Sequence, residues 1–156
     1  MLSFASMEYY MLHLSPNDSK KIFTENTCND FIVEFDKIIN LPDVCFVELM
    51  EIRGFVDERS RETIYVLSDI CQNSTVFGIQ APVLRPVTMN NARRVAQEFI
   101  NTYKIRVASQ SLSRCRIYIR GSDLKKLTFD IKELEITLRL SWPGVNTSSG
   151  KSISLQ

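Results

Sequence analysis

The sequence predicts an all-β fold, a single jelly-roll β-sandwich, and three observations carry this prediction. Seven or eight short stretches have the alternation or the apolar composition of strands. Turn-forming residues separate them at spacings of roughly 8–12 residues, which is typical of sandwiches and barrels. Only one passage, around residues 90–101, has the period of a helix, so we expect at most one short helix there.

Residues 62–87 form the stretch around which the rest is organised. Ile64 and Val66 alternate with Tyr65 and Leu67, so both faces of this strand are largely apolar, as expected of a strand buried between two layers. Residues 69–74 form a polar corner, and the strand resumes over residues 76–79. The prolines at positions 82 and 86 exclude the last part from a central ladder, since proline donates no backbone hydrogen bond.

The N-terminal half predicts three further strands. Residues 7–14 are apolar on both faces and precede a turn cluster of Ser, Pro, Asn and Asp. Residues 31–35 alternate, with Phe, Val and Phe on one face. Residues 44–55 are the longest apolar run and are expected to lie centrally in a sheet. Residues 56–62 are then a charged loop or hairpin tip, either simply solvated or contacting an acidic partner through Arg59 and Arg61.

Residues 88–101 favour a helix. Apolar side chains recur there at helical spacing, and Thr88 or Asn90 is a suitable N-terminal cap. Arg93 and Arg94 would then face solvent. No glycine-rich loop precedes this segment, so it does not predict a phosphate site. The apolar positions are Ala92, Val95, Ala96, Phe99 and Ile100.

The C-terminal part shows the clearest strand signal. A short strand is expected over residues 103–107, and strict alternation follows over residues 115–120, 127–131 and 134–142. After residue 142 the chain becomes polar and small. We therefore predict one domain over residues 1–142 and a flexible C-terminal tail over residues 143–156.

Composition excludes several classes of function. The 156 residues are 44% hydrophobic and carry a net charge of +1, which gives no electrostatic case for nucleic acid or an anionic membrane. The apolar runs are shorter than the ~20 residues of a membrane span, and the first residues lack the pattern of a signal peptide. We expect synthesis in a reducing compartment, with Cys28, Cys45, Cys71 and Cys115 as buried apolar side chains.

The sequence predicts neither an enzyme nor a metal or cofactor site. His13 is the only histidine, and it lies within an apolar strand pattern as a structural residue. Glycine-rich phosphate loops and metalloprotease or hydrolase motifs do not occur. We therefore predict no catalytic, cofactor-binding or metal-binding residues. The neighbouring carboxylates are expected at strand edges, on wet faces or in a loop: Glu48 and Glu51, Glu133 and Glu135, Asp57 and Glu58.

Four segments carry a resemblance to a known family. They are YYMLHLSPNDSKKIFTENTCNDFIVEF, VCFVELMEIR, IYVLSDICQNSTVFGIQAPVLRPV and RIYIRGSDLKKLTFDIKELEITLRLSW. Together they span most of residues 9–142 and resemble the minor capsid, or penton, proteins of Polinton (Maverick) elements and adintoviruses, with the adomaviruses as a neighbouring group. The third segment is the most specific. The resemblance implies an extended segment at residues 88–101, where the apolar period indicates a helix.

The resemblance implies a structural viral capsid protein. Such a subunit would form homopentameric rings at the icosahedral vertices of the virion and contact a double-jelly-roll major capsid protein. Loops at residues 56–62 and 69–74 would contact a host receptor or a fibre, and residues 144–156, or residues 1–5, would extend to a neighbouring subunit. The alternative is a jelly-roll binding module of the lectin or receptor-ligand type. Sugar sites favour exposed aromatic side chains, whereas Trp142 is expected on a buried face.

Overall fold

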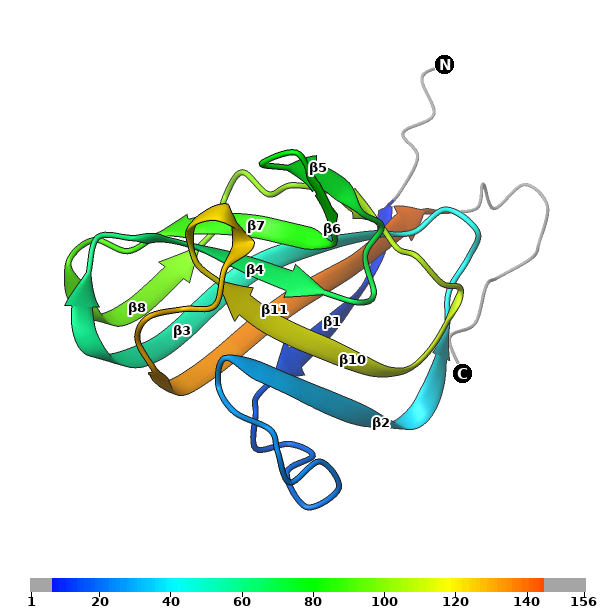
Figure 1. The fold of residues 1–156 in the computed structure, drawn as a ribbon. Coiled ribbons are helices and arrows are strands. Elements are labelled where there is room, and N and C mark those ends of the chain that lie inside the picture. Colours follow the sequence, from blue (N-terminus) through cyan, green and yellow to red (C-terminus); the bar gives the residue numbers. More distant parts are fainter. Residues whose placement is uncertain (1–6, 145–156) are drawn as a thin grey trace.

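The computed structural model describes residues 7–144, which form two antiparallel β-sheets packed face to face (Figure 1). The all-β sandwich expected from the sequence is confirmed. The tail expected from residue 143 onward lies outside the described residues from position 145 on, as do residues 1–6. Sheet A has the order β1-β11-β3-β8, and short β9 also pairs with β3. Its strands are β1 (Met7–Leu14), β11 (Ile131–Pro143), β3 (Phe46–Ser60), β8 (Ala92–Glu98) and β9 (Ile105–Arg106).

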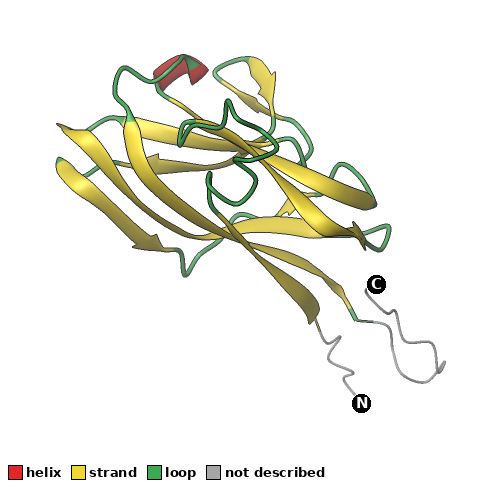
Figure 2. Cartoon of the chain, turned by 90° about the horizontal axis from the view of Figure 1, so that it is seen from below, coloured by secondary structure: helices red, strands yellow, loops and turns green. Residues whose placement is uncertain are grey.

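Sheet B has the order β2-β10-β4-β7. A separate hairpin and one short 3₁₀ turn complete the regular structure, which consists almost entirely of strands (Figure 2). The proline-containing strand β7 lies at the edge of sheet B, as its sequence predicts. The elements are β2 (Asp30–Asn40), β10 (Ser111–Arg120), β4 (Thr63–Ser68), β7 (Val83–Thr88), the hairpin β5 (Ser74–Val76) and β6 (Ile79–Ala81), and the turn η1 (Ser122–Leu124).

The main strands pair in a nested pattern. The first strand pairs with the last, β1 with β11, and the next pair inward is β2 with β10. Strand β3 then pairs with β8, and β4 with β7. Successive pairs alternate between the two sheets, so β1 and β2 form one edge of the sandwich and β7 and β8 the other.

The core lies between the sheets, and alternate residues of the long strands point into it. In β11, the residues from Leu134 to Trp142 alternate between the core and the outer face, and Leu138 and Leu140 are fully buried. In β10, Cys115, Ile117 and Ile119 are fully buried opposite them. Trp142 is 2% exposed, so the prediction that it lies on a buried face is confirmed.

The prediction of a helix around residues 90–101 is wrong. Residues 92–98 form strand β8, which pairs with β3 from Glu51 to Phe55. A helix would have placed Ile100 on its buried face, whereas the Ile100 side chain is 96% exposed and Val95 is buried. The unpaired backbone groups of β3 explain the difference, because pairing with β8 satisfies them.

Three other segments differ in secondary structure from what the sequence predicts. Residues 56–60 continue strand β3 and pair with β8 beyond a bulge, rather than forming a loop. Residues 76–79 are the turn of the β5–β6 hairpin, with Phe77 and Gly78 at positive φ. Residues 127–130 lie outside any strand. Leu127 and Phe129 nevertheless pack against the core, so their alternation reflects how they cover one end of the sandwich.

Candidate functional site

The single histidine, the cysteines and the neighbouring carboxylates of the sequence lie in different surroundings in the described structure. The His13 ring is on the exposed outer face of sheet A, not in a buried strand face, and its Nδ1 lies 3.2 Å from the Thr137 hydroxyl. Within residues 7–144, no three His, Cys, Asp or Glu side chains are grouped as metal ligands.

Three of the four cysteines are buried, as predicted. Burial raises the pKa of the Cys45 thiol to about 11 and that of the Cys71 and Cys115 thiols to about 12. These thiols therefore stay protonated near neutral pH, and a protonated thiol is a poor nucleophile. The prediction of burial is wrong for Cys28, which is only half-buried in the loop between β1 and β2, although it packs against the core.

The expectation that Glu48 lies at a strand edge or on a wet face is wrong. Its side chain is completely buried on the outer side of β3, where the Arg139 side chain, itself 33% exposed, covers it. Arg139 Nε donates to Glu48 Oε2 at 2.9 Å and Arg139 Nη2 donates to Oε1 at 3.2 Å. The hydroxyls of Thr102 and Ser141 donate to the same carboxylate. All the polar atoms of this buried group are satisfied.

The hydrogen bonds decide the charge state of Glu48. Burial on its own would raise the pKa of this carboxyl, but hydrogen bonds from Arg139 and Thr102 outweigh it and hold the pKa below the ordinary value. The sequence does not reveal Arg139 and Thr102 as partners of Glu48, because these pairings span 91 and 54 positions along the chain. Only the register of β3 against β11 would have indicated the pair.

The other carboxylates are accessible. Glu51 is half-buried and pairs with Arg53, while Glu133 and Glu135 are exposed on the outer face of β11. Asp57 and Glu58 are exposed in the extension of β3.

Arg85 of edge strand β7 closes one edge of the sandwich. Its guanidinium lies 4.0 Å from the centre of the Phe99 ring and 4.6 Å from the centre of the Tyr103 ring. Arg85 Nη1 also donates to the carbonyl oxygen of Asn101 at 2.6 Å. Arg85 thereby fixes the segment that follows β8, residues 99–104, which we name the edge loop. Stacking of guanidinium on aromatic rings stabilises such contacts.

The edge loop displays apolar side chains to solvent. Ile100 is 96% exposed and Tyr103 is 55% exposed, although the loop itself is anchored at three points. Besides the Arg85 contacts, the amide of Phe99 donates to the carbonyl of Met50 at 2.9 Å, and Thr102 donates to Glu48. A fixed and exposed aliphatic side chain is the kind of residue that anchors protein interfaces.

The opposite edge, formed by β1 and β2, is open. Strand β2 pairs with β10 at Glu34 and again at Ile39. Between these two pairs β2 has four residues, whereas β10 has only Ser113, so β2 forms a bulge. This bulge creates a recess of about 330 Å³. We name it the edge recess; it is lined by Tyr10, Leu12, Phe35, Asp36, Lys37, Ile38 and Ile39. Tyr10 is 40% exposed and Ile38 is 55% exposed.

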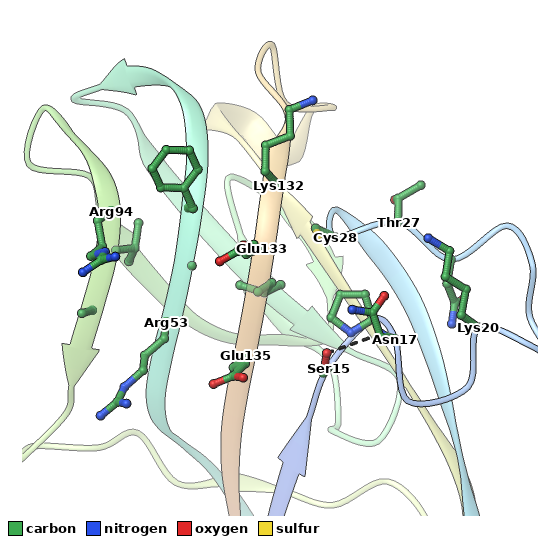
Figure 3. A pocket seen from close by; sticks show the side chains of 17 residues that line it. Ser15, Asn17, Lys20, Thr27, Cys28, Arg53, Arg94, Lys132, Glu133 and Glu135 are labelled. Atoms are coloured by element: carbon green, nitrogen blue, oxygen red, sulfur yellow. Dashed lines mark hydrogen bonds between the residues drawn. The ribbon is translucent and has the colours of Figure 1, made fainter.

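The outer face of sheet A carries a shallow groove of about 610 Å³ beside the loop that follows β1 (Figure 3). Arg53 and Arg94 lie on one side of Glu133 and Glu135, and Lys20 lies on the other (Figure 3). The groove therefore presents alternating charge. Phe55 and Pro16 contribute apolar surface to its walls.

The outer face of sheet B is partly covered by the β5–β6 hairpin. Leu67, Ala81 and Val83 form a second small apolar cluster there. The Phe77 ring at the hairpin turn packs edge-on against Tyr65, with ring centres 5.4 Å apart, and remains 52% exposed. On the same face, Arg116 and Arg120 both lie over the Tyr118 ring.

In the part of the chain that the structure describes, no helix has the length and apolar character needed to cross a membrane. A scan against protein-family models found no matching family, and a search of curated proteins found no match.

Proposed function

We propose that this chain is a structural capsid protein built on a single jelly roll, which forms pentameric rings at the vertices of an icosahedral virion. The observation that carries the proposal is the nested strand pairing. A jelly roll is a long antiparallel hairpin wrapped into two sheets, and it requires first-with-last pairing that alternates between the sheets. The pairs β1–β11, β2–β10, β3–β8 and β4–β7 fit this requirement.

The distribution of exposed apolar side chains supports a role in assembly. Several of the most exposed large apolar residues of the described chain lie at the edges of the sandwich, including Ile100, Tyr9 and Ile38. A closed ring of identical subunits uses two different surfaces of each copy, one on either side. Edges and loops that expose apolar side chains supply such surfaces.

The partners follow from this proposal. The ring would contact itself through its sides and a double-jelly-roll major capsid protein around its rim. A host receptor or fibre would bind at the outer end. The corner at residues 69–74 and the extension of β3 over residues 56–60 lie at opposite ends of β4, so each is the candidate contact for one of the two possible orientations of the subunit.

The experiment that tests the proposal has two parts. Native mass spectrometry of the purified chain is expected to show five copies, and electron microscopy after co-expression with a double-jelly-roll protein is expected to show density at vertices. A chain that stays monomeric at all concentrations and does not enter particles would refute the proposal.

The groove on the outer face of sheet A favours a second candidate, a binding module. Its alternating guanidinium, carboxylate and ammonium groups suit a polar ligand with an anionic group, such as a charged glycan or a receptor segment. Saturable binding of such a ligand to a monomer, lost in Arg94→Ala and unchanged in Arg114→Ala, would favour this candidate over the capsid protein.

A further inference from the structure

We propose that the ring contact is formed when the edge loop of one copy inserts Ile100 into the edge recess between β1 and β2 of the next copy. This inference rests on the proposed function, because it assumes that the chain forms a ring. It names the two surfaces and the residues that join them. Four features of the molecule carry it.

The first feature is the exposed tip of the edge loop. Ile100 is 96% exposed and Tyr103 beside it is 55% exposed, so the tip presents an aliphatic and an aromatic side chain together. The loop is held by Arg85, by the Met50 carbonyl and by the buried Glu48 carboxylate. A tip that is already ordered loses little conformational freedom when it binds.

The second feature is the apolar recess on the opposite edge. Leu12 and Ile39 form its buried part, and Tyr10, Phe35 and Ile38 form its partly exposed walls. The recess exists because β2 bulges away from β10 at this point. Bulges are frequent next to binding sites, and they prevent the edge from simply adding another strand.

The third feature is the position of the edge loop and the edge recess along the strand direction. The edge loop is anchored at Glu48 and Met50 of β3. In the ladders of sheet A, Glu48 is paired with Arg139, and Arg139 is paired with Met11 of β1, between Tyr10 and Leu12. The tip and the recess therefore lie at the same level on opposite edges. A rotation about an axis along the strands joins them without a shift, which closes a ring instead of extending a filament.

The fourth feature is the charge beside each surface. Glu98 immediately precedes the edge loop and lies 4.0 Å from the Arg53 guanidinium, and Lys104 is the last residue of the loop; both are exposed. Asp36 and Lys37 line the recess and are exposed. Each surface thus offers one acid and one base, and the proposed contact pairs Lys104 with Asp36 and Glu98 with Lys37. Complementary charges around an apolar centre set the register of an interface.

The test compares three matched substitutions of exposed isoleucines. Ile100→Asp alters the tip, Ile38→Asp alters the recess, and Ile22→Asp is the control in the loop after β1, where Ile22 is 62% exposed. Native mass spectrometry and sedimentation are run on each variant and on the unmodified chain. We expect self-association to weaken more than 100-fold in the first two variants and to stay unchanged in the control. Circular dichroism verifies that each variant is folded.

A charge exchange provides the second readout. Lys104→Glu and Asp36→Lys are each expected to weaken the ring, and the double variant is expected to restore it. Rings that persist in Ile100→Asp and Ile38→Asp would overturn this inference and leave the proposed function standing. An unmodified chain that never forms rings would overturn both.

Discussion

The two edges of the sandwich are closed by different means. At the β7–β8 edge, the Arg85 guanidinium stacks on two rings and binds a backbone carbonyl, and the loop it holds also donates to a buried carboxylate. At the β1–β2 edge, β2 leaves its ladder and apolar side chains line an open recess. One edge is completed by contacts within the chain, and the other is left incomplete.

Folding stability and binding depend on different side chains at these edges. Polar contacts around the Glu48 carboxylate hold the first edge, so substitutions of the residues that make these contacts are expected to reduce the free energy of unfolding. Exposed apolar residues, Ile100 at the first edge and Ile38 at the second, contribute little to folding, because their surface remains in water. Their substitutions are expected to change association instead. The following predictions separate these two kinds of effect.

The largest effect is expected from Arg139→Ala. This substitution leaves the Glu48 carboxylate buried without its ion-pair partner, which typically costs 3–5 kcal/mol. Because one third of the Arg139 side chain is exposed, we expect about 3 kcal/mol of lost stability by urea unfolding. Arg114→Ala on the exposed face of β10 is the matched control, with an expected change below about 0.5 kcal/mol. Similar values for both variants would show that the buried pair does not hold this edge.

The next largest effect on folding stability is expected at Ile39 of the open edge, and its neighbour Ile38 is the comparison. Ile39 is 8% exposed and packs into the core, so Ile39→Ala is expected to cost about 2–3 kcal/mol of folding stability. Ile38 is 55% exposed, and Ile38→Ala is expected to change it by less than about 0.5 kcal/mol. Both are measured by chemical denaturation at a protein concentration too low for association. A large loss in Ile38→Ala would mean that the recess belongs to the core.

A smaller effect is expected from Arg85→Ala. It removes two cation–π contacts and one hydrogen bond at a partly exposed site, for a combined loss of about 1–2 kcal/mol. Hydrogen exchange is expected to accelerate at the Phe99 amide, and Arg93→Ala on the exposed part of β8 serves as the control. Unchanged exchange at Phe99 would show that Arg85 does not order the edge loop.

The smallest expected effect is a decrease in the free energy of unfolding at acidic pH. The pKa of Glu48 in the folded chain lies below its ordinary value of 4.5, so the ionised carboxylate favours the folded state. This contribution is fully present above pH 4.5 and is lost as the pH falls through the folded-state pKa. Unfolding free energies measured across this range are expected to fall less steeply in Glu48→Gln. Identical slopes would contradict the assignment.

Local patterns predicted the strands well where turn residues bound a run of apolar or alternating side chains. Strand β1 was expected at residues 7–14 and is found there, since a turn cluster follows it. The alternation of β11 likewise predicted its buried face. These features depend on neighbours in the sequence, and the sequence displays them directly.

Features that depend on distant partners were missed. The segment of β8 has helical spacing, and pairing with β3 overrides it. The burial of Glu48 follows from a register between β3 and β11 that no local pattern encodes. The edge recess arises from a bulge in β2, where the side-chain alternation of residues 31–35 stops without a proline or glycine to mark it.

The most direct test of the central claim is the mass of the unmodified chain in solution beside that of Ile100→Asp. We predict a pentamer for the unmodified chain and a folded monomer for the variant. A single copy for both, or five copies for both, would contradict it.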